Sequence, residues 1–180
     1  MVVADVSVRP AHEQDATQIG RVQVAAWQTA YTAILPPSIR EALSPEIAAR
    51  SWLTAITAPP SSRHRVLVAQ DGDWLVGFVA ISPDEDVPAT QQTQQTAVIG
   101  PLLVEPRWGR RGHGSRLLAA ATDTARLNGA TRAVAWLPEA DEVSRKFFAE
   151  AGWAADGAAR VLDAGDRTLR EIRIHTSLAG

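Results

Sequence analysis

A glycine-rich loop between two apolar segments constrains the fold of this chain more than any other feature. Residues 98–104 are apolar and predict a strand. Residues 115–128 predict a helix with apolar positions on one face, at Leu117, Leu118, Ala121 and Ala125. The loop between them holds three glycines within six residues, Gly109, Gly112 and Gly114. This order predicts a strand–loop–helix unit of an α/β protein.

The loop has the properties of a phosphate-binding site. The first N–H groups of a helix lack intrahelical partners, and the helix dipole adds partial positive charge there. Glycines let the backbone approach a ligand, and Arg110 and Arg111 add charge. A solvated Gly-rich turn is the simpler interpretation; a dinucleotide-binding fold is another, although its third glycine would fall at Leu117. The strand before the loop and the helix after it favour a pyrophosphate cradle.

The remaining segments also alternate between predicted helices and strands. Before the loop we expect a strand at 6–9, a helix after a cap at Asp15, a second helix over 38–56, and a hairpin of strands 65–70 and 74–82. After it we expect a strand at 131–137 and a hairpin of strands 158–162 and 168–176. Asp141 can cap a short helix with an inner side formed by Val143, Phe147, Phe148 and Ala151. The acidic, then Gln- and Thr-rich segment 83–96 predicts a mobile connection.

This order of elements implies an α/β fold with one mixed, mostly antiparallel sheet. We expect about six to seven strands with helices on both faces, in a single domain over 1–180. The only strand–helix–strand unit covers 98–137. Gly100 and Pro101 lie inside its first strand and predict a bulge or an unpaired flank, a gap that could admit a ligand.

Composition excludes several classes of function. The net charge of −2 and the scattered basic residues argue against nucleic-acid binding. Lys146 is the only lysine, so no Gly-Lys-Ser/Thr phosphate loop exists, and the absence of cysteine excludes disulfides and thiolate metal sites. The histidines show no metal-ligand spacing, and we expect no metal. With no membrane-length apolar run and no secretory signal, we expect a cytoplasmic protein that binds no membrane.

At 109–114 the chain resembles the GNAT superfamily of N-acetyltransferases. The family signature is Arg or Gln, two residues, Gly, one residue, and Gly or Ala; this chain matches it except at Gly109, where Arg or Gln is expected. Segments 136–137 and 147–153 look like the family's fifth strand and following helix, and 8–11 looks like its first strand. The resemblance thus spans almost the whole chain.

The resemblance implies that acetyl-CoA is the acetyl donor. It implies a sheet splayed between the fourth and fifth strands, with the coenzyme in the gap. The backbone near Leu103 and Val104 would pair with the pantetheine arm, and the amides of 110–115 would hold the pyrophosphate. The full set of implied coenzyme-binding residues is Leu102, Leu103, Val104, Gly109, Arg110, Arg111, Gly112, His113, Gly114, Ser115, Phe147 and Phe148.

Acetyl transfer to an amine sets three chemical requirements. An alkyl amine has a pKa of about 10, so only on the order of one molecule in a thousand is neutral at pH 7. The attack produces an oxyanion, which a backbone N–H near Val104 is placed to stabilise, and a thiolate that needs a proton. Many relatives donate that proton from a tyrosine at the position of Phe148 and carry a glutamate base at that of Val98. Neither group is present here.

Other residues can replace these groups in part. The resemblance places Trp27 and Tyr31 in the helix that lines the acceptor site, where Tyr31 could contact the amine or donate a proton; core packing is the ordinary role of such an aromatic pair. Ser144 lies one turn before Phe148 and could hold a water, although a surface serine is the simpler interpretation. The sequence does not identify the base.

The sequence is compatible with several acceptors and with more than one assembly. A small molecule, a peptide N-terminus or a protein lysine could supply the primary amine, which would attack directly in a ternary complex. The alternative is an acyl-CoA-binding sensor or subunit with weak or no turnover. The last hairpin offers an edge for a possible homodimer.

Overall fold

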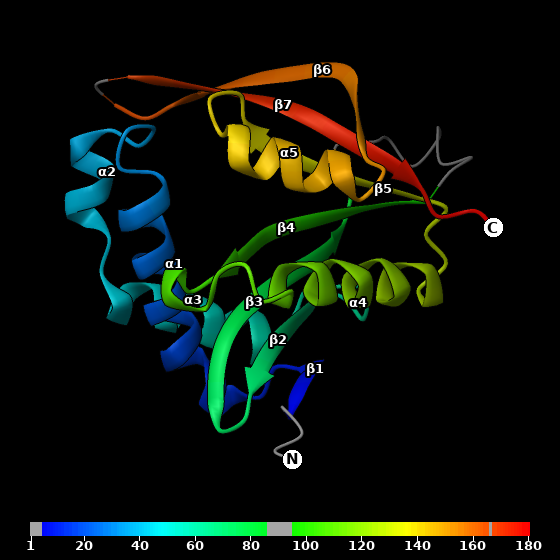
Figure 1. Cartoon of the computed structure of the whole chain (residues 1–180), viewed down its shortest axis with the longest axis horizontal. Helices are drawn as coiled ribbons and strands as arrows, with labels where there is room; N and C mark the ends of the chain where they lie inside the picture. The colour runs from blue at the N-terminus through cyan, green and yellow to red at the C-terminus, as the bar shows by residue number, and fades with distance from the viewer. Residues whose placement is uncertain (1–4, 86–94, 166) are drawn as a thin grey trace.

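One mixed sheet organises the computed structural model, which describes residues 5–85, 95–165 and 167–180. Within these residues seven strands follow the order β1-β2-β3-β4-β5-β7-β6 (Figure 1). Their bounds are β1 Val6–Pro10, β2 Arg65–Asp71, β3 Trp74–Pro83, β4 Thr96–Val104, β5 Arg132–Pro138, β6 Ala154–Asp163 and β7 Thr168–Ser177. Only the pairing of β4 with β5 is parallel among these strands, and the predicted mixed, mostly antiparallel sheet is confirmed.

Helices cover both faces of the sheet, as expected. Their bounds are α1 Ala16–Ala30, α2 Pro37–Ala42, α3 Pro45–Thr57, α4 His113–Leu127 and α5 Glu142–Glu150, with short 3-10 turns η1 Glu13–Asp15 and η3 Pro106–Trp108. Alternation along β2 creates two cores: Val66 and Val68 pack with α1, while Leu67 and Ala69 pack in the cluster that holds α4 and Phe148. The two cores, one on each face of the sheet, therefore follow from the alternation of side chains along the strands.

The single helix predicted over 38–56 is wrong, because the structure contains two helices there. Leu43 and Ser44 have extended backbone, and α3 starts afresh at Pro45. Proline has no N–H to continue a helix but suits its first turn, and the Ser44 hydroxyl accepts from the N–H of Ile47 at 3.4 Å. A proline at the first position and a serine before it are a start signal that the apolar period concealed.

The two predicted hairpins are present. β2 and β3 pair antiparallel around Gly72, which has φ +59°, and β6 pairs with β7 near the top of Figure 1. In the predicted connection 83–96, residues 86–94 lie outside the part that the structure describes.

The sheet opens between β4 and β5. These strands pair only where Thr96, Ala97 and Val98 face Arg132, Ala133 and Val134. Gly100, with φ +138°, follows the paired segment, and the register of β4 against β3 shifts between Val79 and Ile81. The predicted interruption at Gly100–Pro101 is thus confirmed, and from Leu102 to Val104 β4 is paired with β3 alone.

Two side chains in the region of α5 differ from the sequence-based expectation. Val143 and Ala151 do not lie on the inner side of α5: Val143 is 81% exposed and Ala151 is also exposed, because the inward line of this nine-residue helix runs through Ser144 and Phe148, one turn apart. Trp74 is 58% exposed beside the hairpin turn, with the Arg107 guanidinium 5.7 Å from its ring centre.

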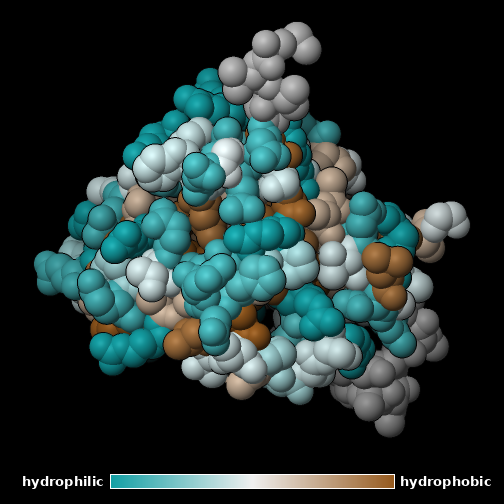
Figure 2. Space-filling view, turned by 90° about the horizontal axis from the view of Figure 1, so that it is seen from below, coloured by the Kyte–Doolittle hydropathy of each residue, from teal (hydrophilic) through white to brown (hydrophobic). Residues whose placement is uncertain are grey.

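Hydrophilic residues dominate the face seen in Figure 2, with hydrophobic side chains in small separate groups. Within the described residues, no helix combines the length and apolar character needed to cross a membrane.

Candidate active site

The glycine-rich loop turns sharply before α4. After η3, Arg110 has φ +60° and Gly112 has φ +81°, both in the left-handed region. The first backbone bond of α4 runs from the N–H of Arg116 to the carbonyl of Gly112 at 3.1 Å. The N–H groups of His113, Gly114 and Ser115 therefore precede the helical ladder and have no intrahelical partner, which makes them donors for an anion.

Glycine keeps this loop clear of side chains. A Cβ on Gly112 would lie 3.1 Å from Nη1 of Arg116, and one on Gly114 would lie 3.5 Å from the ring of Phe147. Gly112 also needs its positive φ, which residues with a Cβ rarely adopt. The backbone is thus open to a ligand where the helix dipole is most positive.

A cavity of about 590 Å³ connects this loop to the open edge of β4. It is bordered by the end of α1, the start of α4, and α5. Most of the predicted site residues line it, namely Tyr31, Leu102, Leu103, Val104, Gly109, Arg110, Gly112, His113, Gly114, Ser115, Ser144, Phe147 and Phe148. Residues distant in sequence therefore meet at one cleft.

The backbone of β4 points hydrogen-bonding groups into the gap. The N–H of Glu105 donates to the carbonyl of Val76 at 2.8 Å, and Val104 lies opposite Gly77. Antiparallel partners alternate between bonded and non-bonded pairs, so the N–H and C=O of Leu102 and Val104 point away from β3. At that level β5 has already separated from β4, and these groups face the cleft.

Two predicted site residues do not line the cavity. The guanidinium of Arg111 lies 4.9 Å from the ring centre of Trp108. The backbone carbonyl of Arg111 accepts a hydrogen bond from Nη1 of Arg116 at 3.1 Å. Trp27 packs against the core formed by α1, α3 and the sheet, the ordinary role of an aromatic at helical spacing.

The imidazole of His113 points into the protein. Its side chain is 1% exposed, and Nε2 lies 3.2 Å from Oδ2 of Asp71 on β2. This placement leaves the backbone N–H of His113, not its ring, as the group available to a phosphate.

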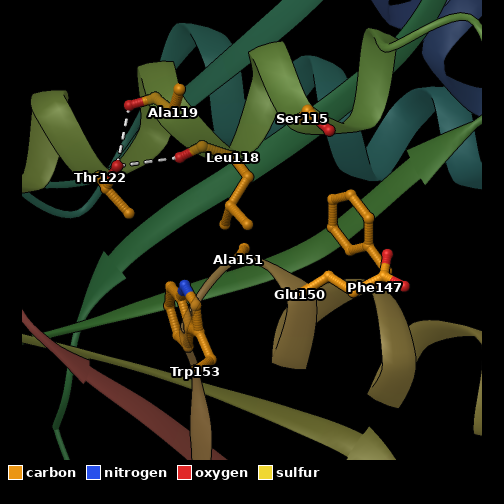
Figure 3. Close-up of a pocket in the computed structure, with 8 residues that line it drawn as sticks. All are labelled: Ser115, Leu118, Ala119, Thr122, Phe147, Glu150, Ala151 and Trp153. Atoms are coloured by element: carbon orange, nitrogen blue, oxygen red, sulfur yellow. Dashed lines mark hydrogen bonds between the residues drawn. The ribbon is translucent and has the colours of Figure 1, made fainter.

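A second cavity, of about 380 Å³, lies between α4 and α5 (Figure 3). Phe147 and Trp153 point toward α4 from one side, and Leu118 points toward them from the other. It shares Ser115, Phe147 and Glu150 with the first cavity. The cleft therefore continues from the splayed strands to the surface between the two helices.

The phenol of Tyr31 lies in a negatively charged environment at the other end of the main cavity. Burial raises the pKa of Tyr31 most, and the carboxylate of Asp141 raises it further, while the Ser144 hydroxyl lowers it. Tyr31 ends α1, whereas Asp141 caps α5 by accepting from the Ser144 N–H at 3.0 Å. The sequence identified Asp141 only as a cap; its position about two helical turns before Phe147 and Phe148 was the available signal for a site role.

The chain belongs to the acetyltransferase (GNAT) family, whose sequence model matches residues 25–153. The match includes β4, the glycine loop and α5, and it confirms the resemblance seen in the sequence and the expected class of enzyme. No curated protein sequence matches the chain.

Solved structures share the fold at low sequence identity. PaiA N-acetyltransferase from Thermoplasma acidophilum, in complex with coenzyme A, is 16% identical with a TM-score of 0.76, over 96% of this chain and 99% of that chain. YncA from Salmonella typhimurium, with its cofactor acetyl-CoA, is 19% identical with a TM-score of 0.71, over 96% and 94%. Ribosomal-protein-alanine N-acetyltransferase from Brucella melitensis is 17% identical with a TM-score of 0.74, over 95% and 99%. The splayed GNAT fold is thereby confirmed.

Proposed function

We propose that this protein transfers an acetyl group from acetyl-CoA to a primary amine by direct attack in a ternary complex. The observation that carries the proposal is the single cleft that joins the open edge of β4 to the unpaired amides at the start of α4. A thioester arm along the first and a pyrophosphate on the second would fill it. Two similar folds, PaiA and YncA, hold coenzyme A and acetyl-CoA.

In this proposal the cradle holds the pyrophosphate through backbone donors. The N–H groups of 110–115, together with the Arg110 side chain that lines the cavity, provide several donors and a positive charge. The pantetheine arm pairs with the cleft-facing groups of Leu102 and Val104, while Phe147 and Phe148 form the opposite wall.

The cleft also meets the requirements of the chemistry. The N–H of Val104 points into the gap and stabilises the oxyanion that forms when the amine attacks the thioester carbonyl. The chain contains no cysteine for a thiol-linked acyl-enzyme, which favours direct attack. Tyr31 provides a hydroxyl at the end of the cavity, which Phe148 cannot.

Calorimetry with acetyl-CoA and free CoA tests the coenzyme site. Gly112→Glu places bulk and negative charge in the cradle and should abolish binding. Gly157→Glu is the matched control, because Gly157 has a similar φ of +88°, has open space around it, and lies on β6 away from both cavities. The proposal is wrong if the wild type binds neither ligand.

Turnover separates an enzyme from a coenzyme-binding sensor. Release of free thiol is measured with small amines, peptide N-termini and lysine peptides, each at saturating acetyl-CoA. Saturable release that Gly112→Glu abolishes identifies an acetyltransferase and its acceptor class. Tight binding without thiol release on any amine would instead identify the sensor.

A further inference from the structure

The carboxylate of Asp141 is buried beyond the needs of a helix cap. The residue is 8% exposed, and Oδ1 alone accepts the capping bond from the Ser144 N–H. Oδ2 is enclosed and accepts no well-aligned hydrogen bond from the described residues, and none of their cationic groups pairs with it. An asparagine or serine would cap the helix without burying a charge. A buried carboxylate that has no cationic partner in the described part of the chain and leaves one oxygen without a well-aligned hydrogen bond is costly, which points to a role in the cavity that it lines.

Tyr31 is the partner that the cavity offers. Its phenol is close enough to Asp141 for the carboxylate to raise its pKa, and Ser144 borders the same end of the cleft. A second carboxylate, Glu171 on β7, also acts on Tyr31, but Arg160 neutralises it through a bond of 2.6 Å from Nε to Oε2. Asp141 is therefore the carboxylate near Tyr31 that has no cationic partner among the described residues.

We propose that Tyr31 and Asp141 form a proton relay for acetyl transfer, an inference that rests on the proposed function. The neutral amine attacks the thioester carbonyl, and a C–N bond forms. Its nitrogen then gives a proton to the Tyr31 oxygen as the Tyr31 proton passes to Oδ2 of Asp141. The C–S bond breaks, and the same proton returns through Tyr31 to the thiolate. The products are the amide and free CoA thiol, with Tyr31 and Asp141 as they began.

The acidities of the groups permit each transfer. A nitrogen that bears a forming acyl bond is far more acidic than the free ammonium, so a carboxylate can take its proton. A carboxylic acid is a stronger acid than a thiol, so the carboxyl can supply the proton that the thiolate needs. The raised pKa of Tyr31 keeps the phenol neutral, so that it passes protons without ionising. One pair would therefore do the work of the base absent at Val98 and the acid absent at Phe148.

Substitutions that keep the local structure test the relay. Asp141→Asn keeps an oxygen for the cap, and Tyr31→Phe keeps the ring. We expect each to lower kcat by about 10²-fold, the lower end for general acid–base catalysis, with acetyl-CoA affinity by calorimetry unchanged. Because the two residues act in one step, the double variant should be no more than about 3-fold slower than the slower single variant. Glu142→Gln removes an exposed carboxylate next to Asp141 and is the control expected to keep full kcat.

A spectroscopic measurement distinguishes the relay from a purely structural role of Asp141 as a helix cap. Tyr31 is the only tyrosine, so ultraviolet difference spectroscopy follows one phenol, whose pKa should fall in Asp141→Asn. The relay is overturned if Asp141→Asn retains kcat within about 3-fold of the wild type, or if the two single losses multiply in the double variant. A wild type that binds no acetyl-CoA or acetylates no amine would instead overturn the proposed function, and the relay with it.

Discussion

Arg9 and Asp15 form a two-pronged ion pair that joins β1 to the start of α1. Nη1 donates to Oδ2 at 2.7 Å and Nη2 to Oδ1 at 3.0 Å, while Oδ2 also accepts from the N–H of His12 at 2.7 Å. The sequence predicted Asp15 as a helix cap. Its carboxylate instead accepts hydrogen bonds from Arg9 and from the N–H of His12 in the turn before the helix.

This pair predicts a loss of stability in acid. Burial alone would raise the pKa of Asp15, but the bonds from Arg9 and His12 outweigh it and lower the pKa. Because the pKa is lower in the folded state, the ionised carboxylate stabilises the fold at pH values above the ordinary pKa of about 4. This contribution is lost as the pH falls through the pKa of the folded state. Asp15→Asn should cost about 1–3 kcal/mol at pH 7 and little in strong acid, by urea unfolding. An equal cost at both pH values would contradict the assignment.

The close crossing of α1 and α3 predicts that Gly20 tolerates no side chain. A Cβ there would lie 2.6 Å from the carbonyl oxygen of Pro45 and 2.8 Å from the nitrogen of Ala49. Both are backbone atoms, so the helices must separate, and we expect Gly20→Ala to lower the free energy of unfolding by about 1–3 kcal/mol. Thr17→Ala, on the exposed side of α1, should be nearly neutral in the same denaturation experiment.

The environment of Tyr31 predicts a loss of stability in alkali. Burial and Asp141 raise its pKa, so the folded state holds the phenol proton more tightly than the unfolded chain. The resulting stability is present below the ordinary pKa of about 10 and is lost as pH rises from there toward the folded value, by up to roughly 1.4 kcal/mol per pH unit. Tyr31→Phe should lack this component. Denaturation of both proteins at about pH 8 and pH 11 checks it; parallel curves would refute it.

The direction of the Val104 N–H predicts contrasting effects of proline at adjacent positions. Val104→Pro removes an N–H that faces the cleft and leaves the ladder to β3 intact, so the protein should fold but lose about 10²–10³-fold in kcat. Leu103→Pro removes a ladder bond to β3 and should destabilise the fold itself. Melting temperatures and thiol-release rates distinguish the two. A folded, fully active Val104→Pro enzyme would exclude this N–H from the reaction.

Local sequence predicted the parts of the molecule that local physics determines. The hairpin at Gly72, the interrupted strand at Gly100 and the glycine cradle each depend on a few consecutive residues whose backbone preferences are strong. The helix break at Pro45 was missed because the apolar period continues through it.

The acceptor end of the site could not be predicted in the same way. Tyr31 and Asp141 meet only when the end of α1 and the start of α5 pack around one cleft. Each has an ordinary local interpretation, as a core aromatic and a helix cap, and nothing in either segment reveals the other. The Arg9–Asp15 pair could not be predicted for a similar reason, since a carboxylate just before a helix normally caps that helix.

The opening between β4 and β5 divides the sheet into two parts whose strands pair with each other at three residue positions. Hydrogen exchange can therefore proceed through a local opening that separates β1–β4 from β5–β7 without unfolding either part. A ligand that spans the opening closes this route, and its free energy of binding adds to the stability of the junction, by about 2.7 kcal/mol at a concentration one hundred times Kd. Slowed amide exchange at the junction is thus a direct physical record of an occupied cleft, whatever the acceptor.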